Sequence, residues 1–430
     1  MIRYRFVDSD WETVTVQGRA GKASGKNKHW WNVKEKDTGN EKAIDTENFE
    51  EVEKVIDNGQ EQVEEAMVVI IPRHLHYQPD CILAKEKELQ NWEDFCVYEE
   101  VQDEGQKTLS TNWVLVKKII DNKETAKARL CVRGDLEEDV DMIRRDSPTV
   151  NKTNIKLFYL IAMHKKWKIK TADVKAAFLQ GSDLDRVVYL KPPKEKRIPG
   201  IIWKMVKRAY GFVDASKGFF LELEETLCQL GGNVSSHDPA MYLYYDEGGD
   251  LKGMILTHVD DLLHGSGDQE FEEQVLKPLK EKFLFGSEEE SAFLYVGMQV
   301  KQSTNSITVS LDHYVENIEV PALDSIDELQ NDEIVDEDSQ ADFRLMVGKL
   351  GWLAKNARPD LGFDSLALST QVGKATAKDV KQVVKIVKKL KAEPSEMKFQ
   401  DLGPIEEWQT VGHGDAGYRS LPDKVSSCGG

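Results

Sequence analysis

Two adjacent carboxylates, Asp260 and Asp261, interrupt an otherwise apolar stretch that runs from Met254 to Leu263. Burying unpaired charge inside a strand is costly. Such a pair is therefore expected at a turn between strands, or where a divalent cation neutralises it. A solvated turn is the simpler interpretation, because Asp is a common turn residue.

A third carboxylate, Asp173, ends a second predicted strand, WKIKTADV. A lone Asp at a strand end is usually structural. If the two strand ends meet, however, three acids converge, and carboxylate oxygens are the ligands that Mg²⁺ prefers. Two such ions can activate an attacking hydroxyl and stabilise a leaving oxygen in phosphoryl transfer. The sequence therefore raises a metal site as the alternative to a plain turn.

The elements that must position these acids alternate without a regular βαβ rhythm, which favours an α+β fold. Apolar spacing predicts helices in 84–95, in 151–167 with Asn151 or Thr153 as cap, and in 216–229 and 268–283. TNWVLVKKI, KARLCVRG, FLYVGMQVK and NSITVSL are predicted strands, and 241–261 is predicted to be a hairpin turning at Gly248-Gly249. Two more helices are expected at 341–355 and 377–390.

Seven motifs follow one another in an order that is similar to that of the reverse transcriptase domain in copia-type retrotransposon Pol polyproteins. They are KARLCVRG (Lys127–Gly134), SPTVNKTNIKLFYLIA (Ser147–Ala162), DVKAAFLQG (Asp173–Gly181), VYLKPP (Val188–Pro193), WKMVKRAYG (Trp203–Gly211), DPAMYLY (Asp238–Tyr244) and THVDD (Thr257–Asp261). The resemblance covers roughly Leu109 to Leu311. It continues in MVGKLGWLAKNARPDLGFD (Met346–Asp364), which resembles the connection region of these polyproteins.

The two ends of the chain carry weaker resemblances. GRAGKASGKNKHWWNV (Gly18–Val33) resembles the segment that links integrase to polymerase, and GHGDAGYRSLPDKVSSCGG (Gly412–Gly430) resembles the opening of a fused RNase H domain. Asp415 is then the first RNase H carboxylate. Since the sequence stops there, we expect a truncated RNase H start that cannot cleave RNA.

The resemblance implies a right-hand polymerase with fingers, palm and thumb, followed by a helical connection region. The expected division is a β-rich connector at 1–45, an acidic linker at 46–83, the reverse transcriptase at 84–320, a second acidic linker at 321–340, the connection region at 341–400 and the RNase H start at 401–430. The stretch Thr46–Glu65 could instead form a weakly amphipathic helix.

The resemblance also implies the chemistry: transfer of a dNMP to a primer 3′-hydroxyl on an RNA template or a DNA primer-template. Asp173 and Asp260 hold two Mg²⁺ ions in such enzymes, and Asp261 supports them electrostatically. The expected substrates are dNTPs, with no membrane partner. The oligomeric state is left open by the sequence.

Nucleotide contacts are implied for a further set of residues. Phe178 is expected to be a bulky gate against the ribose 2′-hydroxyl, although it could be a plain core residue. The resemblance also implies that Lys127, Arg129 and Arg133, on a predicted strand, contact the triphosphate. These three cations could instead form a solvated basic face. Tyr210 and Gly211 are expected to begin the segment that shapes the nucleotide pocket.

This sequence departs from the family pattern at three positions. Asp214 and Ser216 stand where Gln and Pro are frequent, and His258 stands beside the primer terminus where most relatives carry Tyr. A His at that position is expected to titrate near neutral pH.

Composition limits the function classes. The 430 residues carry a net charge of -19 with 40% hydrophobic residues, so bulk charge argues mildly against nucleic-acid binding, while the stretch from Trp113 to Lys175 has an excess of Lys and Arg. Five scattered cysteines and the absence of an apolar leader favour a reducing, intracellular location, cytoplasmic (in a virus-like particle) or nuclear.

Two other functions compete with polymerisation. A degenerate or domesticated element could bind nucleic acid without catalysis, which the motif departures and the acidic balance favour. A metal-dependent nuclease could use the same carboxylates, but nothing else in the sequence suggests a general base.

Overall fold

A computed structural model describes residues 2–5, 12–19, 30–35, 41–45, 51–54, 69–120, 123–138, 140–320, 324–409 and 411. The chain divides into two compact units, Met1–Val63 and Glu64–Gly430.

The first unit contains a five-stranded antiparallel sheet in the order β4-β3-β2-β1-β5. Its strands are β1 (Ile2–Arg5), β2 (Glu12–Arg19), β3 (Trp30–Glu35), β4 (Glu41–Asp45) and β5 (Glu51–Lys54). The described residues among the first 45 all lie in these strands. Strand β5, however, lies in the stretch that the sequence assigns to a linker or a helix.

The second unit begins with two small sheets that pack around helix α1 (Pro79–Asp94). One has the order β10-β9-β6 and the other β7-β13-β12-β8. The strands are β6 (Val69–Ile70), β7 (Tyr98–Gln102), β8 (Thr108–Leu109), β9 (Thr111–Ile120), β10 (Lys123–Val132), β12 (Tyr189–Leu190) and β13 (Ile201–Met205). Helix α1 starts five residues before its predicted beginning, because Pro79 suits a first helical turn.

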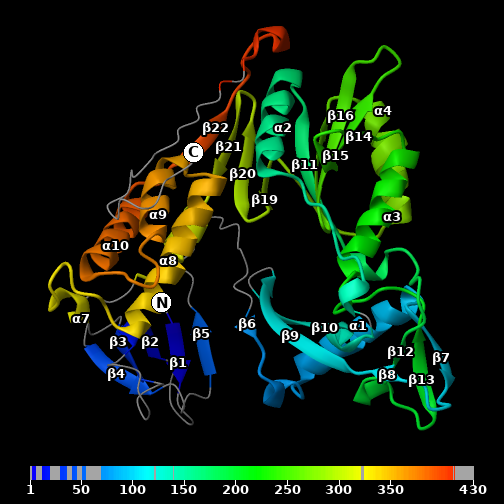
Figure 1. Cartoon of the computed structure of the whole chain (residues 1–430), viewed down its shortest axis with the longest axis horizontal. Coiled ribbons are helices and arrows are strands. Elements are labelled where there is room, and N and C mark those ends of the chain that lie inside the picture. The colour runs from blue at the N-terminus through cyan, green and yellow to red at the C-terminus, as the bar shows by residue number, and fades with distance from the viewer. Residues whose placement is uncertain are drawn as a thin grey trace. The chain divides into compact units, whose positions relative to one another are not determined.

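A six-stranded sheet in the order β14-β15-β16-β17-β11-β18 forms the centre of the second unit (Figure 1). Its strands are β11 (Lys168–Val174), β14 (Asn233–Ser235), β15 (Asp238–Tyr245), β16 (Leu251–His258), β17 (Asp261–Ser266) and β18 (Phe285–Glu290). The predicted hairpin is confirmed as β15 and β16. Strand β11 pairs antiparallel with β17 on one side and with β18 on the other.

Helices cover both faces of this sheet (Figure 1). Phe158 of α2 (Lys152–Lys165) shares one apolar cluster with Leu256 of β16. On the opposite face, Phe219 of α3 (Ala215–Gln229) shares another cluster with Ile255. A continuous helical stretch also lies there: α4 (Gln269–Phe271), a π-helical turn (Glu272–Leu276) and α5 (Lys277–Lys282). Burial on both faces explains why β16 is apolar at successive positions. Each large apolar side chain that is fully buried stabilises the fold by about 1.5–3 kcal/mol.

Asn151 caps α2, since its side chain accepts a hydrogen bond from the Thr153 amide at 2.9 Å. The sequence had left Asn151 and Thr153 open as caps, and the structure selects Asn151.

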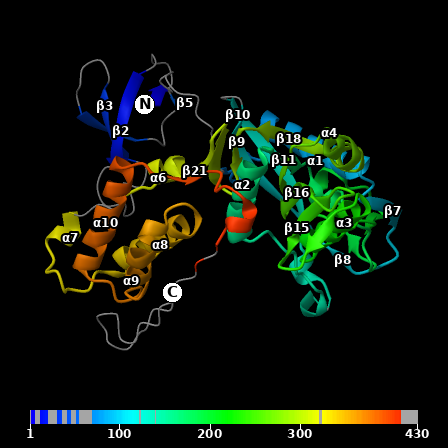
Figure 2. The same ribbon diagram turned by 90° about the horizontal axis from the view of Figure 1, so that it is seen from above.

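The rest of the second unit combines a sheet in the order β19-β20-β21-β22 with a group of helices. The strands are β19 (Ala292–Tyr295), β20 (Met298–Ser303), β21 (Ser306–Ser310) and β22 (Glu396–Phe399), and the helices are α6 (Asp312–Glu316), α7 (Asp324–Asp327), α8 (Glu337–Asn356), α9 (Gly362–Ser369) and α10 (Ala377–Ala392). Figure 2 shows α8, α9 and α10 gathered together. The two predicted helices are confirmed as α8 and α10.

Two features of this part differ from expectation. FLYVGMQVK was predicted as one strand but forms the hairpin β19–β20, because Val296 and Gly297 turn the chain with φ values of 49° and 74°. Within the segment expected to be an acidic linker, Ile326 and Val335 are buried in the same apolar cluster as α8 and α10. That segment is therefore packed against the core.

Four cysteines are described, Cys81, Cys96, Cys131 and Cys228, and all are free thiols. In the described parts of the chain, no helix combines the length and the apolar character that a membrane crossing needs.

His264 of β17 predicts a pH dependence of stability. Burial lowers its pKa to about 3, and Lys170 and Lys280 reinforce the effect. An unfolded His titrates near 6.5, so between about pH 6.5 and 3 the unfolded chain holds one more proton than the folded chain. Stability should fall as the pH drops through this window, by up to about 1.4 kcal/mol per pH unit from this residue.

Urea denaturation at pH 7.5 and pH 5.0 measures this effect. The loss of stability should be about 2 kcal/mol smaller for His264→Gln than for the wild type. His237→Gln, at an exposed position, should leave the wild-type loss unchanged. Equal losses in all three proteins would refute the assignment.

Candidate active site

The strand register brings the three predicted carboxylates to one end of the central sheet. Asp173 of β11 lies directly opposite Asp261 of β17. Opposed residues on antiparallel strands have Cα atoms about 4.5–5.5 Å apart, and Asp260 is the neighbour of Asp261. The amide of Val174 also donates a hydrogen bond of 2.9 Å to the carbonyl oxygen of Asp260. The Cα atoms of Asp173 and Asp260 consequently lie within about 10 Å of each other.

A two-residue turn, Val259-Asp260, connects β16 to β17, because His258 and Asp261 are paired on either side of it. Val259 has a φ of 59°, which is uncommon for a β-branched residue. Strain of this kind costs on the order of 1–3 kcal/mol and is often found at functional sites. The strained turn holds Asp260 at the tip of the hairpin.

Asp173, Asp260 and Asp261 are all partly exposed, whereas Ala172, Val174 and Leu262 beside them are buried. A Cβ atom on Gly286 of β18 would lie 2.6 Å from Oδ2 of Asp173. Glycine at this position thus leaves room for the Asp173 carboxylate at the sheet end.

Among the described residues, no three His, Cys, Asp or Glu side chains are grouped closely enough to hold a metal ion. The register brings the three backbones together, whereas the side chains do not form one ligand set. Partly exposed carboxylates can rotate about χ1, so the backbone register allows all three to approach one cation. The residues present therefore fit a hard divalent cation in type, exposure and strand position.

His258 lies opposite Asp261 and forms an isolated bridge with Thr149. Burial lowers its pKa and Lys152 adds to the effect, while Asp260 opposes it. The environment therefore shifts the pKa of His258 below its usual value and disfavours the charged imidazolium, a shift that no feature of the sequence indicated.

Three of the residues predicted to contact a nucleotide lie together. The rings of Phe178 and Tyr210 have centroids 5.0 Å apart, and the Arg129 guanidinium lies 5.1 Å from the centre of the Tyr210 ring. Burial raises the pKa of Tyr210 to about 12, with Asp260 contributing to the rise. Asp260 thus acts electrostatically on Tyr210, and Phe178, which is partly exposed, lies against the Tyr210 ring.

The other two predicted cations differ from each other. Lys127 is exposed and lies on the same face of β10 as Arg129. Arg133 forms a two-pronged ion pair with Asp135, with both nitrogen–oxygen distances at 2.7 Å. Arg133 is therefore engaged in a local ion pair.

Gly211 has a structural reason to be glycine. Its φ is 94°, and a Cβ atom there would overlap the carbonyl of Val132. The Val132 amide donates a hydrogen bond of 2.7 Å to the Tyr210 carbonyl. Gly211 therefore lets the segment that carries Tyr210 lie directly against the end of β10.

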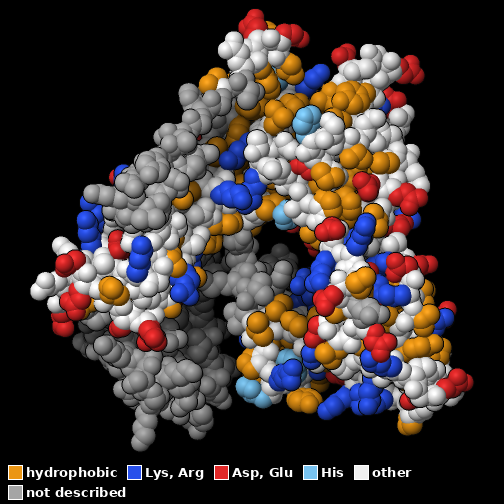
Figure 3. All heavy atoms as spheres, viewed as in Figure 1, with side chains coloured by type: hydrophobic (Ala, Val, Ile, Leu, Met, Phe, Trp, Pro, Cys, Tyr) orange, Lys and Arg blue, Asp and Glu red, His pale blue; other side chains and the backbone are white. Residues whose placement is uncertain are grey.

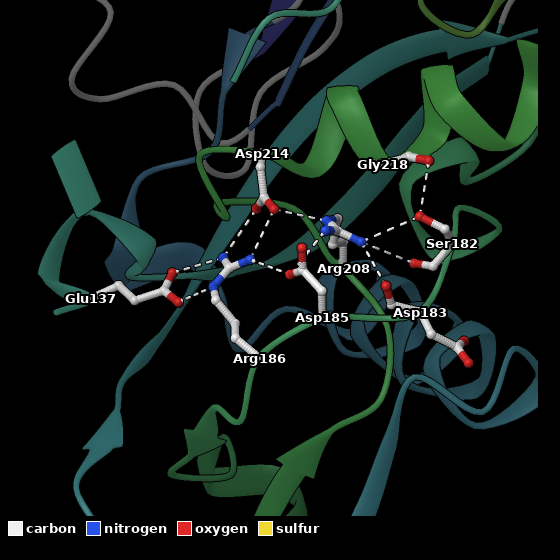
Figure 4. A network of polar contacts seen from close by, with 8 residues as sticks. All are labelled: Glu137, Ser182, Asp183, Asp185, Arg186, Arg208, Asp214 and Gly218. Carbon is white, nitrogen blue, oxygen red and sulfur yellow. Dashed lines mark hydrogen bonds and ion pairs between the residues drawn. The ribbon is translucent and has the colours of Figure 1, made fainter. Parts of the chain in front are cut away.

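A buried network of charges anchors both ends of the Tyr210 segment, and sequence reasoning missed it (Figure 4). Asp214, only 3% exposed, accepts hydrogen bonds from Arg186 at 2.9 and 3.1 Å and from Arg208 at 2.8 Å. Arg186 also pairs with Glu137. Burial raises the pKa of Asp214, but the hydrogen bonds from the two arginines outweigh it and keep the pKa below its usual range.

Arg208 completes the network. It is 7% exposed and donates to the carbonyl oxygens of Asp183 at 2.7 Å and Ser182 at 3.3 Å, and to the Asp185 carboxylate at 3.2 Å. Gly218 of α3 leaves space for its side chain, since a Cβ atom there would collide with the arginine (Figure 4). The only signal in the sequence was the departure at Asp214, which the two arginines neutralise.

Asp415 and the segment around it lie outside the described residues.

Comparisons with known proteins identify the family of this chain. A family model described as "Reverse transcriptase (RNA-dependent DNA polymerase)" matches residues 96–323, which is more than half of the chain. The chain therefore belongs to the reverse transcriptase family, whose members are RNA-directed DNA polymerases.

Two relatives from Arabidopsis thaliana are the Retrovirus-related Pol polyproteins from transposons RE1 and RE2. They are each 27% identical to this chain, over 208 and 207 residues respectively. Each match covers 47% of this chain and 14% of the relative. The chain thus spans about one seventh of the length of these polyproteins, and the predicted resemblance to Pol polyproteins of copia-type elements is confirmed.

Among solved structures, an apo telomerase from Candida tropicalis, truncated from its C-terminal domain, is similar at 9% identity with a TM-score of 0.30. The match covers 52% of this chain and 59% of that one. A TM-score this low does not establish a shared fold.

The buried network predicts a large effect of Asp214→Ala. Removing the carboxylate leaves Arg186 and Arg208 without their shared buried partner, which should cost about 3–5 kcal/mol of unfolding free energy. Urea denaturation measures this cost. Asp183→Ala is the matched control, because the Asp183 side chain is exposed and only its carbonyl contacts Arg208; it should change stability by less than about 0.5 kcal/mol. A cost below about 1 kcal/mol for Asp214→Ala would contradict the assigned role of the network.

Proposed function

We propose that this chain polymerises DNA on a primed RNA or DNA template, using a two-metal site that Asp173, Asp260 and Asp261 form. The observation that carries the proposal is the register that sets Asp173 opposite Asp261, with the Asp260 carbonyl bonded to the amide of Val174. Membership of the reverse transcriptase family supports the same reaction.

In this proposal Asp173 and Asp260 hold two Mg²⁺ ions, and Asp261 stabilises them electrostatically. When bound, the ions would activate the primer 3′-hydroxyl and neutralise charge on the α-phosphate and on the leaving pyrophosphate. The protein's own contribution is mainly positioning and charge. The sheet end supplies carboxylates in a fixed register, and His258 is paired with Asp261, where a primer terminus is expected.

The nucleotide wall is proposed to consist of Phe178, Tyr210 and Arg129. The guanidinium of Arg129, together with Lys127 and, once released from Asp135, Arg133, would bind the triphosphate. Phe178 would exclude a ribose 2′-hydroxyl by its bulk. Gly211 and the Asp214 network would keep Tyr210 against β10, which supports this wall.

The larger organisation is proposed on the same basis. Residues 84–320 would form fingers, palm and thumb, with the central sheet as the palm, and 341–400 would form the connection region. Asp415 would open an RNase H domain. Segment 1–45 would be the connector. Segments 46–83 and 321–340 would join these parts, although each includes residues that belong to strands or to the packed core.

Asp260→Asn tests the catalytic proposal. The substitution keeps the size of the side chain and removes its charge, so single-nucleotide incorporation on a primed RNA template should fall by about a thousandfold or more. Asp250→Asn changes the same chemical group in the exposed β15–β16 turn and should retain wild-type activity. A wild-type chain that binds primer-template and Mg²⁺ but incorporates nothing would refute polymerisation. Wild-type incorporation by Asp260→Asn would refute the assigned role of Asp260.

Phe178→Ala tests the sugar gate. Removing the ring should raise incorporation of rNTP relative to dNTP by about tenfold or more, because a lost steric clash admits the larger sugar. The matched control is Phe363→Ala, since Phe363 is 71% exposed. An unchanged ratio in Phe178→Ala would show that this ring belongs only to the core.

A further inference from the structure

A groove of about 940 Å³ lies on the α1 side of the β9–β10 hairpin. It is lined by helix α1, the start of β9 and the segment that follows β12. None of the contacts described for the candidate active site involves this groove.

The groove and the nucleotide wall use opposite faces of the hairpin. In β10, Ala128 and Leu130 are buried against the α1 side, whereas Lys127 and Arg129 are exposed on the other. Trp113 is paired with Leu130, and it lines the groove. The groove is therefore a separate surface.

The lining of the groove is basic, although the chain as a whole has a net charge of -19. Three glutamates line it, Glu86, Glu93 and Glu195. Six cations line it as well: Arg73, Lys85, Lys191, Lys194, Lys196 and Arg197. Glu93 is paired with Lys196 at 2.6 Å, and Glu195 with Lys85 at 3.0 Å. Most of the acidic charge is thus already neutralised, which leaves a local positive field. Figure 3 shows Lys and Arg side chains interspersed with hydrophobic ones over this part of the molecule.

The centre of the groove is an organised aromatic and cationic cluster. Lys85, 6% exposed, lies 5.7 Å from the Tyr77 ring centre and 5.6 Å from that of Trp113. Glu195 accepts hydrogen bonds from Lys85 at 3.0 Å and from the Trp113 indole at 3.2 Å. Tyr77 is 76% exposed. A large ring this exposed, held beside a buried cation, offers a flat surface on which another ring can stack.

We infer that this groove binds single-stranded nucleic acid, with a base stacked on Tyr77 and with phosphates contacted by Lys191 and Lys194. Aromatic platforms combined with a cationic groove are the chemistry by which proteins bind single strands without sequence preference. The inference rests on the proposed function for the origin of the strand, since a polymerase copies an unpaired template.

Fluorescence anisotropy of the full chain with a labelled 20-nucleotide oligo(rU), without Mg²⁺, primer or dNTP, tests the inference. Lys191→Gln/Lys194→Gln should weaken binding and make the slope of log affinity against log salt shallower by about 1.4, the value for two phosphate contacts with a single strand. Tyr77→Ala should weaken binding by about fivefold or more.

Matched controls remove the same groups elsewhere. Lys301→Gln/Lys398→Gln takes two exposed lysines from β20 and β22, and Tyr245→Ala takes a ring that is 44% exposed. These variants should bind oligo(rU) as the wild type does. The inference is overturned if the wild type does not bind oligo(rU), or if the groove variants behave like the controls. It is also overturned if a polyglutamate peptide of equal length binds as tightly and with the same sensitivity to the groove variants.

Two measurements separate this inference from the polymerase proposal: oligo(rU) binding by the groove variants and dNTP incorporation by the wild type. Loss of binding in the groove variants, together with a wild type that incorporates no dNTP, would refute polymerisation and leave the groove assignment standing. Normal dNTP incorporation by the wild type, together with unchanged oligo(rU) binding in the groove variants, would refute the groove assignment and leave polymerisation standing.

Discussion

The pairing of β11 with β17 is the constraint on which the proposed chemistry depends. Hydrogen bonds along these strands place Asp173 opposite Asp261, and the Val174 amide holds the turn that carries Asp260. A slip by one residue would turn the side chains of β11 to the opposite face. Burial of both sheet faces, by Phe158 on one side and Phe219 on the other, resists such a slip. The apolar core therefore helps to fix the strand register that positions the carboxylates.

A second set of forces shapes the wall beside the carboxylates. In the sequence, Tyr210 lies between Arg208 and Asp214. These two residues are both buried, and a hydrogen bond of 2.8 Å joins their side chains. Burying these charges is costly, and it is compensated only when each has its partners. The network thus favours one arrangement of the segment. It also argues against reading Asp214 as a sign of a degenerate element, because Arg186 and Arg208 both form hydrogen bonds with its carboxylate.

The sequence predicted those features that arise from local patterns. The helix after Asn151, the β15–β16 hairpin and the helices α8 and α10 follow from apolar period, capping and turn residues, and the order of motifs identified the family. Features that depend on residues distant in the chain were missed. No local signal shows that Arg186 meets Asp214, that Ile326 is buried beneath helices, or that burial and Lys152 lower the pKa of His258. The hairpin at Val296-Gly297 was missed because its first residue is β-branched, which is unusual in a turn with positive φ.

The central claim is that Asp173 and Asp260 share bound metal, and metal-directed cleavage of the polypeptide tests it most directly. Fe²⁺ can be substituted for Mg²⁺, and peroxide then generates hydroxyl radicals that cut the backbone near the ion. We predict cuts close to both residue 173 and residue 260, with both sets lost together in Asp173→Asn. Cuts near only one of the two positions, or persistence of the cuts near residue 260 in that variant, would contradict the shared site.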